Sequence, residues 1–196
     1  MTNSATGGYL APTSKPFVPR NLNLEQFIQS VIVGITSYPG TLVRPKWQAA
    51  PPKQPDLSID WIAYGISIIG SDANAYVWLD SHDVTNLNRQ ESIEVQCAFY
   101  GPHAIDNITI FRDGFQIQQN LDALRFAKMG FKEISPANRG PDLVNERWVE
   151  RYETTLILVR QVLRSYPILS FASASGTIHT VIGNDPTNLP WQSGGV

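Results

Sequence analysis

Charged residues are scarce in this 196-residue sequence. Asp, Glu, Lys and Arg make up 16% of it, and the formal net charge is −2. Soluble domains usually contain about 25% charged residues, so the surface must be covered by uncharged polar residues or be buried against other subunits. The five Trp and seven Tyr residues favour burial in an assembly, because interface cores are poor in charge and rich in aromatics.

Basic runs, cysteine pairs and long apolar runs are also missing. Without clustered Lys and Arg, the chain has no surface for tight binding to nucleic acid. The single cysteine, Cys97, excludes an intramolecular disulfide and suits synthesis in a reducing cytoplasm. No apolar run reaches the roughly 20 residues of a spanning helix, and the first residues carry no signal-peptide pattern. We therefore expect a soluble protein made inside a cell.

The clearest structural pattern lies between Gln90 and Gln116. Apolar residues first alternate with polar ones, which predicts a half-buried strand over Glu91–Tyr100. After Gly101-Pro102 the apolar spacing becomes helical, which predicts a helix over His103–Gln116. The residues of these two apolar faces are Ile93, Val95, Cys97 and Phe99, then Ala104, Ile108, Phe111 and Phe115. The alternation places Cys97 in the core as a packing residue and not as a nucleophile.

The rest of the chain predicts an α+β fold with a mainly antiparallel sheet and two or three helices packed on it. A helix is expected over Leu24–Thr36, with Asn23 as its N-cap, and a second helical piece from Asn120 to Met129, closed by Gly130. Ser81–Arg89 is expected to be a loop. The expected strands are Leu42–Arg44, Trp61–Ile69, Tyr76–Asp80, Phe131–Ile134, Arg147–Arg164 and Ile168–Ala174.

Both ends of the sequence differ in composition from the middle. They are rich in Gly, Pro, Asn, Ser and Thr and have no periodicity. We expect an extended N-terminal arm over residues 1–22, a single domain over residues 23–175 and an extended C-terminal arm over residues 176–196. Tyr9 and Trp191 are the candidate interface residues of these arms.

The strand expected over Arg147–Arg164 supplies four further candidates for a subunit interface. Residues 156–159 are apolar on both faces, which suggests a helix on one face and a neighbouring subunit on the other; Ile157 and Val159 lie on the second face. Arg151 and Glu153 lie two apart on one face and suit cross-strand or intersubunit pairing, or a solvated ion pair.

No set of residues indicates catalysis, a cofactor site or a metal site. The three histidines, His82, His103 and His179, lack metal-ligand spacing. One polar cluster contains Asp80, His82 and Asp83. Such a cluster is typical of a solvated turn, and a cation site is the alternative interpretation. We expect a protein that is not an enzyme.

Several short motifs, in order over residues 5–180, resemble the neck or tail terminator family of tailed bacteriophages. They are Ala5-Thr6-Gly7-Gly8-Tyr9-Leu10, Val33-Gly34-Ile35-Thr36, Val43-Arg44-Pro45-Lys46-Trp47-Gln48, Pro51-Pro52-Lys53-Gln54-Pro55, residues 93–102, Arg112-Asp113-Gly114, Leu143-Val144-Asn145, Trp148 and Arg151-Tyr152. The resemblance implies a virion structural protein of the neck or tail. It implies a ring, commonly a hexamer, that caps the tail tube or sheath and joins it to the head–tail connector. Genomic DNA would pass through the lumen without specific binding.

Two alternatives stay open at this point. One is a portal-side head-completion or adaptor ring, which would follow the twelvefold symmetry of the portal. The other is a small metal-dependent hydrolase that uses Asp80, His82 and Asp83.

Overall fold

The computed structural model describes residues 8–13, 22–50, 52–80, 83–144, 146–168, 174–182 and 185–193. They belong to two compact units. The larger unit contains Lys15–Val77 and Leu87–Arg164, and the smaller contains residues 1–14, 78–86 and 165–196. The single domain that the sequence predicts over residues 23–175 stays a prediction.

The larger unit is built on a mixed, mostly antiparallel sheet with the strand order β1-β2-β4-β9-β5. β1 runs parallel to β2, whereas the β2–β4 and β5–β9 pairs are antiparallel. The bounds are β1 Val43–Pro45, β2 Trp61–Ser71, β4 Val84–Tyr100, β5 Met129–Ile134 and β9 Arg151–Pro167. Two short strands join the sheet, β3 (Tyr76–Leu79) on β4 and β6 (Asn138–Arg139) on β9. The predicted α+β class is confirmed.

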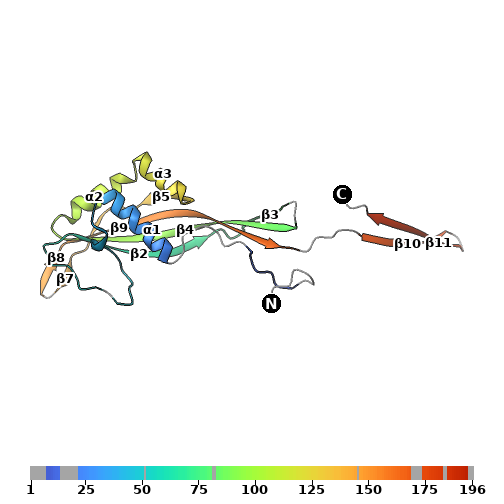
Figure 1. Ribbon diagram of the computed structural model, residues 1–196, viewed down its shortest axis with the longest axis horizontal. Helices are drawn as coiled ribbons and strands as arrows, with labels where there is room; N and C mark the ends of the chain where they lie inside the picture. Colours follow the sequence, from blue (N-terminus) through green and yellow to red (C-terminus); the bar gives the residue numbers. More distant parts are fainter. Residues whose placement is uncertain are drawn as a thin grey trace. The chain divides into compact units, whose positions relative to one another are not determined.

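Three helices cover one face of this sheet (Figure 1): α1 (Leu22–Thr36), α2 (Ala104–Gly114) and α3 (Gln118–Phe126). A 3-10 turn, η1 (Gly40–Leu42), leads from α1 into β1. The helices contribute apolar side chains at helical spacing, and the strands contribute alternate residues, to one hydrophobic cluster. Its fully buried members include Ile28, Ile32, Ile62, Ile93, Ile108, Phe111, Leu124 and Leu156. The opposite face carries no helix from the described ranges.

Four phenylalanines link three elements of this core. Phe99 of β4 lies 5.5 Å from Phe111 of α2 between ring centroids. Phe111 meets Phe115 edge-on at 5.1 Å, and Phe115 stacks on Phe131 of β5 at 5.2 Å. Tilted and offset aromatic pairs of this kind add about 0.5–1.5 kcal/mol each beyond area burial. Cys97 is fully buried in the same cluster, and burial raises the pKa of its thiol to about 12. This position agrees with a packing residue.

The predicted switch from strand to helix at Gly101-Pro102 is confirmed. Gly101 has φ +110°, and a Cβ there would lie 2.4 Å from Asp60 Oδ1, so only glycine fits. The strand itself is longer than predicted, because it begins at Val84 and replaces most of the expected loop over Ser81–Arg89. Asn86 and Asn88 favour turns locally, but pairing with neighbouring strands overrides that preference.

Three predicted helix ends are wrong. α1 begins at Leu22, so Asn23 lies inside the helix and is not its N-cap. α3 begins at Gln118, and Asn120 instead donates from Nδ2 to the Gly114 carbonyl at 2.8 Å. Gly130 does not close this helix either, because it already belongs to β5.

The long strand predicted over Arg147–Arg164 is two strands. β8 (Arg147–Val149) pairs with β7 (Asp142–Val144) in a separate two-stranded sheet, and β9 starts at Arg151. Trp148 is consequently exposed, although alternation along Arg147–Arg164 puts it on the same strand face as Tyr152, Leu156 and Leu158. Those three residues pack on the core.

The smaller unit contains a β-hairpin of β10 (Ala174–Ile182) and β11 (Asp185–Ser193). The sequence predicted a strand over Ile168–Ala174 and no regular structure after it. Ile168 is not in a strand, and residues 169–173 lie outside the described residues. Near Ser165, Thr13 N donates to the Ser165 carbonyl at 2.8 Å. Of the expected N-terminal arm, residues 1–7 and 14–21 are outside the described part.

Candidate interaction surface

The helix-free face of the sheet is the candidate functional surface. The strand residues on this face alternate with the core residues Ile62 and Tyr64. Opposite each other across β2 and β4 lie Trp61 and Tyr100, Ala63 and Ala98, and Gly65 and Gln96. Ala63, Gly65 and Ala98 thus leave the middle of the face low, and the aromatic side chains of Trp61 and Tyr100 occupy one end.

The segment after β1 folds back over the middle of this face. A Cβ added to Gly65 would lie 2.8 Å from Cη2 of Trp47, so the indole lies directly against the glycine. Lys46 N donates to the Tyr64 carbonyl at 2.6 Å, which fixes the start of the segment on β2. Trp47 remains mostly exposed on its other side. The close approach explains why a glycine stands at position 65.

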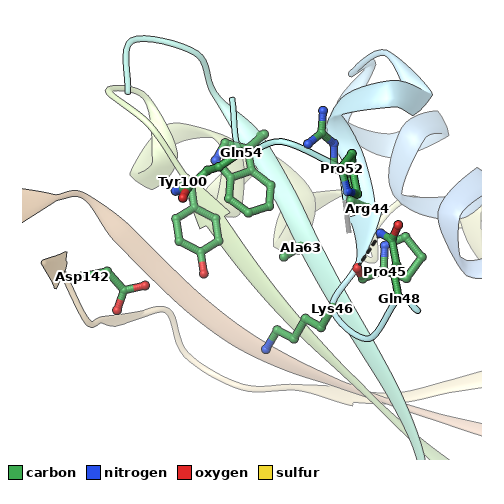
Figure 2. A pocket seen from close by; sticks show the side chains of 10 residues that line it. Arg44, Pro45, Lys46, Gln48, Pro52, Gln54, Ala63, Tyr100 and Asp142 are labelled. Atoms are coloured by element: carbon green, nitrogen blue, oxygen red, sulfur yellow. Dashed lines mark hydrogen bonds between the residues drawn. The ribbon is translucent and has the colours of Figure 1, made fainter. Parts of the chain in front are cut away.

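This segment and the sheet enclose a hollow of about 330 Å³ (Figure 2). The Trp61 and Tyr100 rings stack at 4.2 Å with 6° between their planes and form one side of it. The other lining residues are Arg44, Pro45, Lys46, Gln48, Pro52, Gln54, Ala63 and Asp142. Stacked rings beside a few polar groups are typical of recognition surfaces.

The charges around the hollow differ in how far they are neutralised. Arg151 Nη1 donates to both oxygens of Asp142, at 2.5 and 2.6 Å, and Arg151 Nη2 donates to Glu153 Oε1 at 2.7 Å. Arg44 donates to the carbonyls of Thr41 and Lys53. Within the described part of the chain, Lys46 forms no ion pair, and its side chain extends beside the opening in Figure 2. Lys46 is therefore the cation available to a partner.

Two candidate interface residues from the sequence, Arg151 and Glu153, lie next to this hollow, because Arg151 pairs with the lining residue Asp142. Arg151 also pairs with Glu153, so intrachain ion pairs are already present. Burial raises the pKa of Tyr100, while the Arg151 guanidinium beside it acts in the opposite direction. The contact of this cluster with a neighbouring subunit stays a prediction.

The four remaining candidates lie in different places. Ile157 keeps only 8% of its surface exposed within one chain, so it offers little area to a neighbour. Val159 is half-buried opposite Gly130, where a Cβ would lie 3.2 Å from Val159 Cγ2. Tyr9 is almost fully exposed. Trp191 lies in β11, opposite Gly176.

Sequence reasoning missed Lys46, Trp61, Tyr100 and Asp142 as members of one hollow. They come from the segment after β1, from β2, from β4 and from β7. The one available signal was that Trp61 and Tyr100 stand at opposite ends of two predicted strands. They meet only in the antiparallel register that the structure shows.

For the alternative hydrolase, the decisive residue lies outside the described residues. Asp80 ends the β3 region and Asp83 precedes β4, but His82 between them is not described. Among the described residues, no group of three or more His, Cys, Asp or Glu side chains could hold a metal ion.

These features define an α+β structural protein whose notable surfaces suit binding to other macromolecules. A profile of the phage neck terminator protein family matches residues 22–182. The match covers most of the chain, and the protein belongs to that family. No curated protein matches the sequence. The resemblance recognised from the motifs is thus confirmed.

Family membership establishes the coarse function and location. The protein is a structural component of the phage neck, located in the virion, where it interacts with other neck and tail proteins. Across the described ranges, no helix is long and apolar enough to cross a membrane.

Proposed function

We propose that the protein assembles into a closed ring, a hexamer, at the head–tail junction. One face of the ring caps the tail tube and stops its growth, and the other receives the head–tail connector. Membership of the phage neck terminator family is the observation that carries this proposal. One repeated head-to-tail contact between identical subunits generates a closed ring when its rotation closes.

Exposed apolar side chains support assembly. Large apolar residues on a monomer surface cost free energy in water, and groups of them mark contact sites. The most exposed here are Tyr9, Trp47, Tyr76, Leu79, Phe126, Leu143 and Trp148. In the proposed ring they lie at contacts between subunits or with adjoining neck and tail proteins.

The charge balance supports a DNA conduit. With 15 basic and 17 acidic residues, the chain has a sequence pI of about 5.9 and no basic run. A lumen lined by such subunits would not retain phosphate groups, because phosphate affinity grows with each neutralising Lys or Arg. DNA slides through without specific contacts. This structural role requires no cofactor and no catalytic residue.

The terminal segments and the helix-free face form the proposed contact regions. The six candidates are Arg151, Glu153, Ile157, Val159, Tyr9 and Trp191. The arms reach across to neighbouring subunits or adjoining rings, a role suited to their Gly- and Pro-rich composition.

Electron microscopy of purified phage particles, with the protein marked by a specific antibody, tests the position. Native mass spectrometry of the isolated full chain tests the copy number. A ring of six at the head–tail junction is the expected result. A ring of twelve against the portal would favour the adaptor alternative, and the absence of the protein from the junction would overturn the proposal.

A further inference from the structure

One edge of the main sheet is only partly covered. β1 pairs with β2 from Val43 opposite Ile62 to Pro45 opposite Tyr64. β2 continues for seven more residues, to Ser71, while its other side stays paired with β4. In the described part of the chain, no strand pairs with residues 65–71 on the β1 side. A free strand edge therefore remains.

The register shows which residues point their backbone groups out of this edge. The Tyr64 carbonyl accepts from Lys46 N, so Tyr64 faces the β1 side. Backbone N–H and C=O groups of one residue point to the same side, and the side alternates along a strand. Ile66 and Ile68 thus face outward, up to the bulge between Ile68 and Gly70. A Cβ on Gly70 would meet nothing within 4 Å, so the sheet face is open at that position.

This edge lacks the usual protection against strand pairing. Natural edge strands are guarded by Lys, Pro or other charged residues. Residues 66–71 read Ile-Ser-Ile-Ile-Gly-Ser and contain neither charge nor proline, and Ile68 and Ile69 are both exposed. An uncharged, isoleucine-rich edge favours an added strand, which would supply the missing backbone hydrogen bonds.

The hairpin of the smaller unit has one guarded and one open edge. In the register, Pro186 lies opposite Val181 and Pro190 opposite Thr177. Proline has no N–H, so it fits a strand where its nitrogen faces away from the paired neighbour. Both prolines thus remove donors from the outer edge of β11. β10 contains no proline and no Asp, Glu, Lys or Arg, and β11 is its only strand partner among the described residues.

The same register assigns the outward residues of β10. In an antiparallel pair, the backbone N–H and C=O groups of two opposite residues either both point toward the partner strand or both point away from it. The backbone nitrogens of Pro190 and Pro186 point away from β10. Their opposite residues, Thr177 and Val181, therefore point their N–H groups away from β11, toward the outer edge of β10. A two-stranded hairpin is marginally stable alone, and a third strand on this side would stabilise it.

We propose that β10 of one copy pairs with the free edge of β2 in a second copy, so that the sheet continues across the subunit boundary. The two edges match because both are uncharged, and neither contains proline or a Lys guard. The contact joins two different surfaces, so repeating it from copy to copy generates a ring or a filament. The inference rests on the proposed ring and names its interlocking strands.

Proline substitutions in the full-length chain test the pairing. Ile68→Pro removes an outward N–H from β2 and leaves the ladder with β4 intact, and Thr177→Pro does the same for β10. Each is expected to raise the concentration needed for assembly by about tenfold or more, measured by mass photometry. Circular dichroism must show an unchanged fold.

A charge at the edge, with a matched control, separates pairing from loss of an exposed isoleucine. Ile68 in β2 is 56% exposed and Ile110 in α2 is 52% exposed. Ile68→Lys is expected to weaken assembly as the proline variants do, because a lysine guards an edge. Ile110→Lys is expected to leave assembly unchanged, and an equal effect of both variants would overturn the proposal.

Chemical cross-linking identifies the two partners. Ile68→Cys and Thr177→Cys chains are prepared separately, mixed and joined with a short bis-maleimide; Cys97 is buried and serves as the unreactive background. A cross-link between the two variants is expected only in the mixture. A cross-link within Ile68→Cys alone would replace the proposal with a two-fold contact between β2 edges. A strand from another neck protein on β2 would likewise overturn it.

The outcomes for the ring and for the strand pairing are distinguishable. A wild-type ring that survives Ile68→Pro and Thr177→Pro overturns the strand pairing and leaves the ring standing. A wild-type chain that stays monomeric overturns both. Dodecamers that dissociate in both proline variants support the pairing and overturn the hexamer.

Discussion

Arg160 of β9 donates two hydrogen bonds to one carboxylate oxygen of Glu91 in β4, from Nε at 2.9 Å and from Nη2 at 2.7 Å. The side chains are 1% and 11% exposed, so the ion pair is withdrawn from water. Glu91 lies on the same strand face as the core residues Ile93 and Val95. The buried face of the sheet therefore ends in a buried ion pair at this position and not in apolar side chains.

Removing one partner of this pair should be strongly destabilising. Glu91→Gln removes the negative charge that faces the buried Arg160 guanidinium, and breaking a buried ion pair costs about 3–5 kcal/mol. Urea denaturation gives the free energy of unfolding. Glu150→Gln is the control, because the Arg139–Glu150 pair is 60% and 43% exposed, so solvent screens it and a much smaller loss is expected. Equal losses in the two variants would contradict this account.

Stability should depend on pH through His103. Asp60 Oδ1 accepts from His103 N at 2.8 Å, and Asp60 Oδ2 lies 2.9 Å from His103 Nδ1. The hydrogen bond with Asp60 and its charge raise the pKa of His103 above the usual 6.5. The folded state thus gains stability that is fully present below about pH 6.5 and is lost as pH rises through the raised pKa.

An NMR titration of the His103 ring measures this shift directly, and Asp60→Asn is the matched variant. The wild-type pKa should exceed that of the variant, and the fall in stability with rising pH should diminish in Asp60→Asn. A wild-type His103 pKa at or below about 6.5 would refute the prediction.

Two glycines should respond oppositely to alanine. Gly101→Ala combines φ +110° with a Cβ 2.7 Å from the Asp60 Cα, so a loss of about 1–3 kcal/mol or more is expected. Gly34 lies in α1 with nothing within 4 Å of its added Cβ. Gly34→Ala should stabilise the protein by about 0.5–1 kcal/mol, because alanine favours helix. Thermal melting of both variants measures the direction of each change in stability. A Gly101→Ala protein as stable as the wild type would contradict the prediction.

Lys46 should matter for assembly and not for folding. Since Lys46 forms no ion pair in the described part of the chain, Lys46→Ala should change the free energy of unfolding by less than about 0.5 kcal/mol. The same variant should weaken ring assembly, because the hollow loses the cation available to a partner. Lys132→Ala is the control, because Lys132 is an exposed residue of β5. Sedimentation velocity and chemical denaturation together decide, and unchanged assembly would exclude Lys46 from the contact.

Local periodicity was sufficient to predict the core residues but not to predict where the strands begin and end. The stripe Ala104, Ile108 and Phe111 predicted α2, since helix burial follows 3.6-residue spacing. The start of β4 at Val84 could not be predicted, because its residues resemble a loop until neighbouring strands supply hydrogen bonds. The hairpin at the C-terminus was missed for a related reason, as Pro186 and Pro190 argue against a strand unless they face an outer edge.

The candidate surface was predictable only in fragments. Arg151 and Glu153 were recognised as neighbours on one strand face, and the structure adds Asp142 from β7 as a second carboxylate partner of Arg151. Asp142 could not be assigned, because β7 and β8 were hidden inside one apparent long strand and the loop before it. Trp61 and Tyr100 required a register between two strands, which no local pattern contains.

The burial of Cys97 has a consequence for the life of the particle. Phages assemble in a reducing cell and are released into oxidising surroundings, where exposed thiols on many identical subunits would form random disulfides. A thiol with a pKa of about 12 inside the core is neither ionised nor reachable. This subunit can therefore leave the host cell without oxidation of its one thiol.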